Sequence, residues 1–371
     1  MALTDVLSQF GKMDLFKKGS VLGVDIGSSS IKVVELQKKG SSAKLLKYGT
    51  LSLGPFAQSD IGSAQRLPDS DLVNVVKTAI EAIGVGTKKG GFAIPLKLSL
   101  IVTIDIPASA EGKLDSIVPI EARKYIPMQP SEVNLAWSVI SDSNAKSLSK
   151  KKDESEKKIK VLVAAIHNNT VDAYHTIAEK SGVNPAIFEI ETFSAIRSVF
   201  GQDQGVFALL DIGADASKVL IIDYGSITVS HTIHRGSQAF TQRISETLGI
   251  SFPEAEKIKR KTGMRGVVGS VNLQELLLQD VDFIMQEAKR VIENFEKQNG
   301  KKIEKVALIG GGALMNGSLE VAQVVFGKKV FLGNPFSSIE LPTPLLAPVL
   351  AATGPEFAVA CGIALRALNE L

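Results

Sequence analysis

Two segments of the chain share a pattern of residues that could hold the phosphates of a nucleotide. Each contains Asp-Ile-Gly, a run of small residues, and a lysine seven positions after the aspartate, at 25–32 and again at 211–218. Small residues in a turn leave backbone N–H groups free to converge on anionic oxygens. We therefore expect two phosphate loops, formed by Gly27, Ser28, Ser29, Ser30 and Lys32 and by Gly213, Ala214, Asp215 and Ser217.

The aspartates of the two copies, Asp25 and Asp211, would repel a phosphate that they touched directly. Their presence is explained if a magnesium ion that keeps most of its water shell lies between the carboxylates and the phosphates. One Asp-Ile-Gly alone is common at strand ends, where the glycine only makes a turn. Two copies in matching contexts indicate a nucleotide site, with Asp25 and Asp211 as water-mediated magnesium ligands or water-orienting groups.

A third glycine-rich segment, Ile309-Gly-Gly-Gly-Ala313, lies between an apolar run and a predicted helix. Successive glycines let the backbone lie flat against a base or ribose, close to the N-terminus of the following helix. No Gly-Lys-Ser/Thr follows, so this is not a Walker loop, and it does not open a Rossmann βαβ unit. A tight turn that needs positive φ is the purely structural alternative. We expect Gly310, Gly311, Gly312 and Ala313 to contact a nucleoside.

The elements that position these loops follow from the spacing of apolar residues. Apolar runs on both sides of each phosphate loop predict β-hairpins over 21–36 and 205–223. Helical periodicity predicts helices over 71–83, ended by Gly84, and over 276–297, ended by Asn299-Gly300. A segment of small residues predicts a last helix over 357–368, and 314–326 is also predicted to be helical.

The region between the two hairpins predicts a further unit. Strands are expected over 98–106, 135–139 and 159–166, with a helical stretch over 110–126 that Pro119 disturbs. Residues 141–158 are rich in Ser, Lys, Asp and Glu and cannot bury enough surface to offset their ordering entropy. We expect them to form a flexible hairpin tip.

Composition excludes several classes of protein. The formal net charge of +3 is too small to indicate a nucleic-acid binder. A single cysteine, Cys361, excludes an internal disulfide or a cysteine-based metal cage, and a reducing cytoplasm is expected. Residues 1–7 do not read as a secretion signal. The uncharged stretch 341–355 is interrupted by prolines and too short to span a bilayer.

Several of these segments also carry a family resemblance. The residues concerned are Val21-Leu-Gly-Val-Asp-Ile-Gly-Ser-Ser-Ser-Ile-Lys-Val-Val-Glu-Leu36, Glu121-Ala, Tyr125-Ile-Pro127, Glu189-Ile-Glu191, the second phosphate pattern, Arg235-Gly236 and Ile309-Gly-Gly-Gly-Ala313. With them, residues 21–371 resemble the actin-like ATPase superfamily and, within it, the PilM family of type IV pilus assembly proteins, which are relatives of FtsA. The resemblance implies an α/β actin-like fold, with two RNase H-like halves and an inserted subdomain of the FtsA/PilM type.

The resemblance also implies a division of the chain. The expected parts are an N-terminal extension (1–20), subdomain 1A (21–97), an inserted subdomain 1C (98–185) whose tip is 141–158, a return to 1A with the first hinge (186–204), subdomain 2A (205–235), subdomain 2B (236–302), a second part of 2A (303–355) and a C-terminal hinge helix (356–371). The loops at 25–32, 211–217 and 310–313 would be the first phosphate, second phosphate and adenosine loops. Ala358 and Gly362 would form a small-residue helix crossing at the second hinge.

Two further site residues follow from the resemblance, and one residue already named departs from it. Glu254 and Lys257 resemble residues of subdomain 2B that reach ribose and adenine. Asp215 departs from the family pattern, which has a small or hydroxyl residue there. An extra anion facing phosphates is costly unless magnesium or a lysine offsets it. Because no water-activating residue stands out either, we expect at most weak ATPase activity.

The loops predict ATP and Mg²⁺ binding, and the resemblance implies a cytoplasmic adaptor of the type IV pilus inner-membrane complex. It would bind the cytoplasmic N-terminal tail of PilN, contact other pilus inner-membrane assembly proteins and associate with the membrane only indirectly. Self-association is left open, and no nucleic-acid partner is expected. Apolar residues of 3–10 at helical spacing predict a tether to a membrane or partner, or a helix that packs on its own domain.

Two other functions remain open. An FtsA-like filament-forming scaffold would be favoured by a C-terminal membrane-targeting helix, whereas 357–371 is assigned to the hinge helix. A small-molecule kinase of the same superfold would need an aspartate that deprotonates a substrate hydroxyl in line with the γ-phosphate. No candidate motif for that base lies between the phosphate loops.

Overall fold

The structure is a computed structural model that describes residues 19–126, 129–140 and 158–371. The predicted N-terminal helix and almost all of the predicted hairpin tip lie outside these residues. The strands are β1 (Ser20–Ile26), β2 (Ser30–Lys39), β3 (Ser42–Ser52), β4 (Lys89–Ile94), β5 (Ser99–Pro107), β6 (Val133–Val139), β7 (Lys158–His167), β8 (Asn184–Ile190), β9 (Val206–Ile212), β10 (Ser217–Asp223), β11 (Ser226–Ile233), β12 (Val267–Val268), β13 (Val271–Asn272), β14 (Lys305–Ile309) and β15 (Lys329–Leu332). The helices are α2 (Asp69–Ile83), α3 (Leu114–Ala122), α5 (Asn168–Lys180), α6 (Glu191–Phe200), α7 (Gln238–Leu248), α8 (Phe252–Lys261), α9 (Leu273–Asn299), α10 (Ser318–Phe326), α11 (Ala347–Thr353) and α12 (Ala358–Asn369).

Two five-stranded sheets repeat one topology. The first has the order β3-β2-β1-β4-β8 and the second β11-β10-β9-β14-β15. In each, the first three strands are antiparallel and the last two run parallel to the third. The two phosphate patterns occupy equivalent turns, between β1 and β2 and between β9 and β10. The duplication inferred from the two Asp-Ile-Gly segments is therefore confirmed, as is the mixed α/β actin-like fold.

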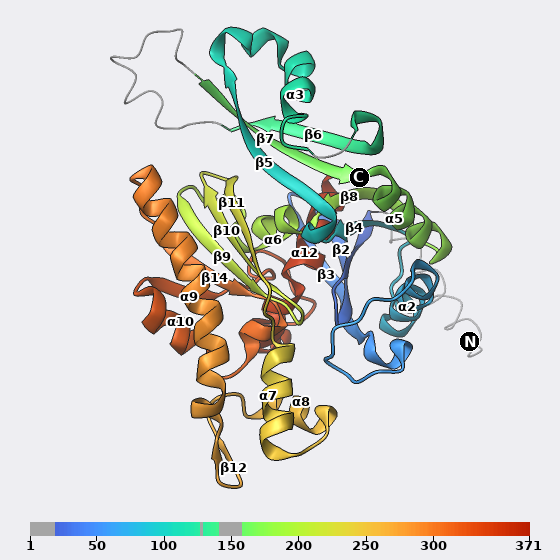
Figure 1. Cartoon of the computed structure of the whole chain (residues 1–371). Helices are drawn as coiled ribbons and strands as arrows, with labels where there is room; N and C mark the ends of the chain where they lie inside the picture. Colours follow the sequence, from blue (N-terminus) through green and yellow to red (C-terminus); the bar gives the residue numbers. More distant parts are fainter. Residues whose placement is uncertain (1–18, 127–128, 141–157) are drawn as a thin grey trace, which may run out of the picture.

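Helices α6 and α12 lie between the two sheets, as Figure 1 shows. Side chains of α6 pack against β9, β10 and β14 of the second sheet, and α12 packs against β1 and β2 of the first. The outer face of the first sheet is covered by α2 and α5, and that of the second by α7, α9 and α10. We refer below to the first sheet with α2 and α5 as the first half, and to the second sheet with α7 to α10 as the second half.

The central helices approach closely because small residues lie at their crossing. A Cβ atom added to Gly362 would lie 1.8 Å from the carbonyl oxygen of Ser194. The Ser198 hydroxyl donates to the carbonyl of Ala358 at 2.7 Å. A Cβ atom added to Gly23 of β1 would lie 2.1 Å from the carbonyl oxygen of Ala360. The predicted small-residue contact at Ala358 and Gly362 is present, and it joins α12 to α6.

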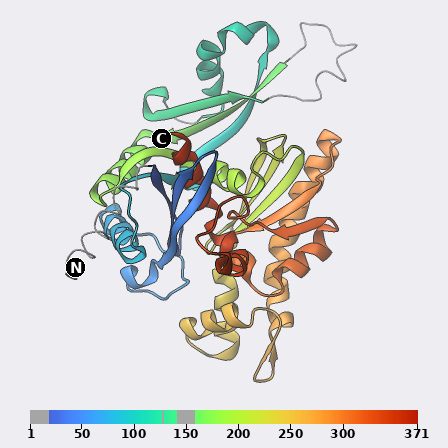
Figure 2. The ribbon, with the colours of Figure 1, turned by 180° about the vertical axis from the view of Figure 1, so that it is seen from behind.

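The inserted unit is a separate three-stranded sheet with the order β5-β7-β6, covered by α3. It lies beyond one end of the two larger sheets, as the view from behind in Figure 2 shows. The predicted insertion reached residue 185, but α5 packs with α2 and β8 pairs in parallel with β4. Residues after His167 thus return to the first half. The apolar periodicity of α5 could not reveal which sheet it covers.

Helix ends follow the expected chemistry in most places. Both α2 and α9 end at left-handed glycines, Gly84 at φ 70° and Gly300 at φ 63°, which closes the last turn. The helix predicted from residue 314 begins only at Ser318. Gly317 has a φ of 96°, which interrupts helical geometry before that point.

One stretch of the described residues, Pro344–Asn369, is long and apolar enough by composition to cross a membrane. It is not one continuous helix but contains α11 and α12 joined through the 3-10 turn Gly354–Phe357. Ala358 to Ala364 of α12 are all buried inside the protein. The composition of this stretch is therefore explained by its position between the two sheets.

Candidate functional site

A cavity of about 800 Å³ lies between the two halves and is lined by all three loops predicted from the sequence. Its volume is in the usual range for sites that enclose a small molecule or cofactor. Residues from β1, β10, α6, α8 and the segment before α12 face the same space. A ligand that fills it would contact both halves at once.

The two phosphate loops have the same backbone geometry. The Gly27 N–H donates to the Ser30 carbonyl at 3.1 Å, and the Gly213 N–H donates to the Ala216 carbonyl at 3.1 Å. A Cβ atom added to Gly213 would lie 2.8 Å from the Ala216 oxygen. Each Asp-Ile-Gly therefore ends its strand in one tight turn that has little room for a side chain at the glycine.

Most of the predicted loop residues line the cavity. All five from the first loop do so, as do Gly213, Ala214 and Asp215 from the second. Ser217 does not, because its buried hydroxyl instead donates to the Arg235 carbonyl at 2.8 Å. Asp215 is exposed to solvent at the cavity wall, so its charge is hydrated and is less costly than an enclosed carboxylate.

Each loop aspartate faces a lysine on the neighbouring strand, but the two lysines have different surroundings. Asp25 pairs in register with Lys32, and Asp211 with Lys218. Lys218 Nζ lies 3.3 Å from Asp211 Oδ2 and 3.0 Å from Glu191 Oε1. Lys32 makes no hydrogen bond or ion pair with a residue that the structure describes. Its ammonium group is therefore free to meet an anion in the cavity.

The sequence marks Glu191 only as part of a segment that carries the family resemblance, yet its side chain is part of the site. It is the first residue of α6, directly after β8 of the first half, and it is 8% exposed. Its Oε1 accepts the N–H of Leu96 at 2.6 Å in addition to the Lys218 ammonium. The sequence could not show this contact, because 96, 191 and 218 meet only in the folded chain.

Burial and neighbouring charges shift two pKa values at this end of the cavity. Burial, together with the carboxylates of Glu191 and Asp211, raises the pKa of Asp25 to about 6, although Lys32 and Lys218 oppose the shift. Burial lowers the pKa of Lys218, but Glu191 and Asp211 outweigh it and hold that pKa above its usual value. Lys218 is thus a permanent cation at neutral pH.

The carboxylates fit a hydrated magnesium ion better than a directly coordinated one. Asp25 and Asp211 both line the cavity. Within residues 19–126, 129–140 and 158–371, no three His, Cys, Asp or Glu side chains are grouped to hold a metal. Mg²⁺ keeps several waters and takes its other ligands from phosphates, so two carboxylates are sufficient. One oxygen of Asp211 is already paired with Lys218, however.

The glycines at 310–312 pack the third loop onto the second phosphate loop. Gly310 has a φ of 83°, and a Cβ atom there would lie 2.4 Å from Asp211 Oδ1. One added to Gly312 would lie 2.4 Å from Ile212 Cγ2. All three glycines line the cavity, whereas Ala313 is buried beneath them and does not. Gly310 and Gly312 are therefore needed for this close packing, whereas a Cβ atom added to Gly311 would meet nothing within 4 Å.

Helix α8 presents a different face to the cavity from the one expected. Glu254 and Lys257 are exposed and do not line it. Glu254 instead accepts the N–H and hydroxyl of Ser251 at the start of the helix, at 3.0 and 2.7 Å. Glu256, Lys259 and Arg260 do line the cavity. Their i, i+3, i+4 spacing was the available signal, since it places them on one helical face.

Glu256 is held in a network of polar contacts. It is 4% exposed, and its Oε2 lies 2.7 Å from Lys259 Nζ and accepts the Thr241 hydroxyl at 2.6 Å. Arg260 Nε donates to Oε1 at 2.7 Å. Burial would raise the pKa of Glu256, but these partners lower it overall, so the carboxylate stays ionised. The carboxylate can accept a hydrogen bond from one hydroxyl of a ligand, and the neighbouring Lys259 ammonium group can donate one to another.

A segment of the first half closes over the cavity from the side of α7 and α8. Residues 58–67, which we call the clasp, connect the 3-10 turn after β3 to α2 (Figure 1). The Ala64 N–H donates to the side-chain oxygen of Gln238 on α7. Gly62, at φ 93°, lies so close to α8 that an added Cβ would be 2.6 Å from Glu256 Cδ. The clasp therefore contacts α7 at Gln238 and α8 at Glu256, of which Glu256 lines the cavity.

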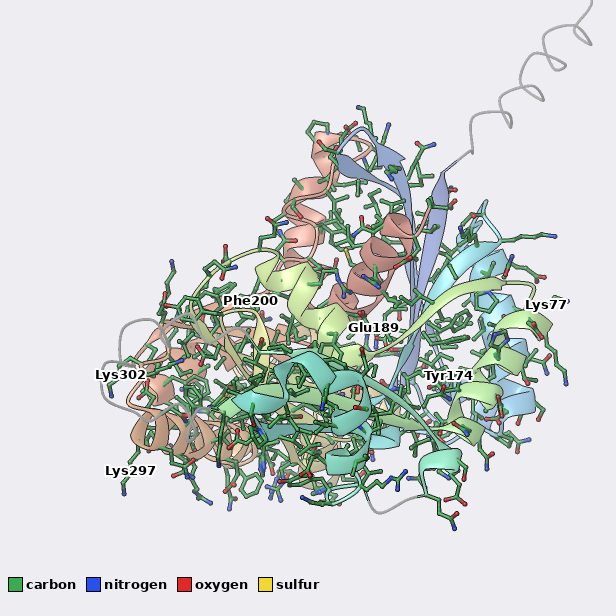
Figure 3. All side chains as sticks on the ribbon, turned by 90° about the horizontal axis from the view of Figure 1, so that it is seen from above. Lys77, Tyr174, Glu189, Phe200, Lys297 and Lys302 are labelled. Carbon is green, nitrogen blue, oxygen red and sulfur yellow. The ribbon has the colours of Figure 1, made fainter. Side chains whose placement is uncertain are left out.

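Glu189 connects β8 to both central helices. In Figure 3 it lies between first-half residues such as Lys77 and second-half residues such as Lys297. Its carboxylate makes two 2.6 Å contacts with Arg197 of α6, whose Nη1 also donates to the Gly362 carbonyl of α12 at 3.1 Å. This bidentate pair fixes the position where the chain passes from the first half to the helices between the sheets.

Comparison with known proteins gives one consistent result. The model of the family described as type IV pilus assembly protein PilM matches residues 23–368. The cell division protein FtsA of Enterococcus faecalis is 22% identical over 376 residues, covering 90% of this chain and 83% of FtsA. FtsA of Streptococcus pneumoniae is 26% identical over 202 residues, which is 48% of this chain but only 43% of that protein.

Solved structures show the same fold. A PilM-PilN type IV pilus biogenesis complex matches with a TM-score of 0.75 and 23% identity, covering 94% of this chain and 98% of the other. MreB5 of Spiroplasma citri bound to AMPPNP matches with a TM-score of 0.51 and 12% identity, covering 94% and 96%. The second of these structures holds an ATP analogue.

Proposed function

The chain belongs to the family of the type IV pilus assembly protein PilM, and from that premise we propose that it is an ATP-binding adaptor of the type IV pilus inner-membrane assembly complex. In this role it binds the cytoplasmic N-terminal tail of PilN when nucleotide holds its two halves together. It works in the cytoplasm and reaches the inner membrane only through such partners. The observation that carries the proposal is a cavity that both halves line with equivalent phosphate loops.

We assign each part of ATP to a group of residues that line the cavity. Lys32 and the N–H groups of the two loops would meet the phosphates, with Asp25 and Asp211 facing the hydrated magnesium ion. Magnesium, when bound, would neutralise phosphate charge. The 310–312 glycines and the Glu256–Lys259 pair would meet the nucleoside. This replaces the assignment of Glu254 and Lys257, which lie outside the cavity.

ATP binding without hydrolysis is sufficient to favour one conformation over another. A ligand present at about 1,000 times its dissociation constant stabilises the state that binds it by about 4 kcal/mol. Residues of both halves and of the clasp line the cavity, so ATP bound there would stabilise the state in which they lie together. Slow hydrolysis agrees with the contacts of Glu191, whose Oε1 already accepts Lys218 and the Leu96 N–H and is a poor base for water.

The inserted subdomain offers the place for the tail. Its strands β5 and β6 are the two edges of the three-stranded sheet. An extended peptide can add main-chain hydrogen bonds to such an edge and gain specificity from side-chain contacts. Exposed apolar residues are available on this subdomain, namely Ile120, Tyr125 and Val139. They are suited to the alternate side chains of a bound strand.

The competing role is an FtsA-like scaffold, which the similarity to two FtsA proteins favours. The two roles differ in self-association. A scaffold would polymerise with ATP at micromolar concentration, whereas the adaptor would stay of constant size, which sedimentation velocity distinguishes.

Thermal unfolding with and without Mg²⁺-ATP tests the nucleotide part. We expect a rise in Tm for the natural chain and a smaller rise for Lys32→Met, which lacks the ammonium group assigned to the phosphates, with circular dichroism confirming that the variant is folded. If Mg²⁺-ATP fails to shift the Tm of the natural chain, the nucleotide claim is wrong. A titration with the cognate PilN tail tests the adaptor part, and equal binding of a scrambled tail would contradict it.

A further inference from the structure

The phosphate end of the cavity contains more charged side chains than phosphate binding requires. Three carboxylates, those of Asp25, Glu191 and Asp211, face it together with the ammonium groups of Lys32 and Lys218. The side chains of Glu191, Asp211 and Lys218 are 11%, 15% and 19% exposed. Three largely buried carboxylates would repel a triphosphate strongly unless cations accompany them.

Lys218 already occupies a cation's position among these carboxylates. Its Nζ lies 3.0 Å from Glu191 Oε1 and 3.3 Å from Asp211 Oδ2, and Asp25 is near enough to feel its charge. The cross-strand partner of Asp211 is thus committed to carboxylates, whereas its counterpart Lys32 has no such contact with a described residue. The two equivalent lysines therefore perform different tasks.

We propose that Lys218 is a resident cation of the nucleotide site, and that it makes ATP binding only weakly dependent on Mg²⁺. The inference rests on the proposed nucleotide function. The ammonium group offsets one of the two negative charges of Glu191 and Asp211, and with Lys32 it reduces the charge of the three carboxylates to about one negative charge before any metal enters. Because it pairs with an oxygen of Asp211, Lys218 also competes with a metal for that carboxylate.

The test is the ratio of two ATP dissociation constants, one measured in excess EDTA and one in Mg²⁺, by isothermal titration calorimetry. For the natural chain we expect a ratio below about 10, which is 1.4 kcal/mol. For Lys218→Met we expect the ratio to be at least about tenfold larger, because only a metal can then balance the carboxylates. Lys32→Met is the matched control, in which affinity falls in both buffers and the ratio stays near that of the natural chain.

A second variant keeps the proposal testable if Lys218→Met does not fold. Lys218→Met leaves two largely buried carboxylates unpaired, which is destabilising in itself. The double variant Lys218→Met with Glu191→Gln carries one carboxylate fewer. We expect its ratio to fall between those of the natural chain and Lys218→Met. If Lys218→Met does not fold, a ratio for the double variant above that of the natural chain supports the proposal, and an equal ratio contradicts it.

The outcomes separate the two claims. If the natural chain binds no ATP in either buffer, the proposed function fails. If it binds ATP in Mg²⁺, loses more than about 100-fold in EDTA and Lys218→Met shows the same ratio, only the resident cation is wrong. As a readout without nucleotide, Mn²⁺ titration followed by electron paramagnetic resonance should show tighter metal binding to Lys218→Met. Unchanged Mn²⁺ binding would count against competition for Asp211.

Discussion

Lys218 Nζ lies 3.0 Å from Glu191 Oε1, and this ion pair connects the second half of the molecule to the start of α6, directly after the last strand of the first half. The same ammonium group lies 3.3 Å from the Asp211 carboxylate of the second phosphate loop. Glu191 Oε1 also accepts the N–H of Leu96, from the segment that follows β4 of the first half, so one carboxylate contacts residues of both halves. The phosphate end of the cavity and the junction between the halves are therefore one structure.

Substitution on α8 distinguishes the face that lines the cavity from the face that was expected to do so. We predict that Glu256→Gln weakens ATP binding by about tenfold, because a buried carboxylate with ligand-facing contacts is lost. Glu254→Gln should leave ATP affinity unchanged, since Glu254 only caps the helix. Calorimetric titration of both variants checks this. A loss confined to Glu254→Gln would restore the sequence-based assignment.

The clasp should control how long nucleotide stays bound. In Gly62→Ala, the new Cβ meets Glu256 Cδ at 2.6 Å and displaces the clasp, so we expect ATP to dissociate about tenfold faster. Gly40→Ala is the matched control, because Gly40 also has positive φ, at 59°, but nothing lies within 4 Å of an added Cβ. Stopped-flow release of a fluorescent ATP analogue measures both rates. Equal rates would show that the clasp does not hold the ligand.

The crossing of the central helices should tolerate no added volume. Gly362→Ala brings a Cβ to within 1.8 Å of the Ser194 oxygen, and overpacking of this kind costs about 1–3 kcal/mol of unfolding free energy or more. Gly112→Ala adds the same methyl group where nothing lies within 4 Å and should change little. Urea denaturation compares the two. A neutral Gly362→Ala would mean that α12 and α6 can move apart at no cost.

Burial of Asp25 makes stability depend on pH. Its pKa is raised from 3.8 to about 6 in the folded protein, so folding favours the protonated carboxyl. The contribution of the protonated Asp25 carboxyl to stability is complete below about pH 4 and is lost as pH rises through 6. At neutral pH the buried carboxylate then lowers the free energy of unfolding by about 3 kcal/mol. Asp25→Asn should therefore stabilise the nucleotide-free protein at pH 8, and the gain should shrink as pH falls from 6 to 4. Urea denaturation measures the unfolding free energy of both proteins across this pH range. A constant difference between Asp25→Asn and the natural chain would show that burial does not disfavour the Asp25 carboxylate.

The sequence revealed the loops because their chemistry is local. Asp-Ile-Gly followed by small residues and a lysine specifies a strand, a tight turn and a cross-strand pair within eight residues. Two copies then predicted two matching hairpins, and the structure contains both. The glycines at 310–312 were found for the same reason, since a run of glycines directly after a buried strand indicates a turn that another group approaches closely.

The remaining site residues depend on contacts between distant segments. Glu191 meets Lys218 and the Leu96 N–H only after the two halves assemble, and no local pattern marks it. The choice between Glu254 and Glu256 depends on the rotation of α8 about its axis, which Thr241 and the clasp fix. The end of the insertion was misplaced likewise, because α5 could have covered either sheet.

The central claim is that nucleotide and the PilN tail favour the same closed state, so the most direct measurement is the dissociation constant of the tail peptide with and without ATP. The two ligands are coupled if both bind one state better, and each must then tighten the other equally. We predict at least about tenfold tighter peptide binding in ATP, and a matching effect of the peptide on ATP affinity. The same peptide affinity in both conditions would contradict the account.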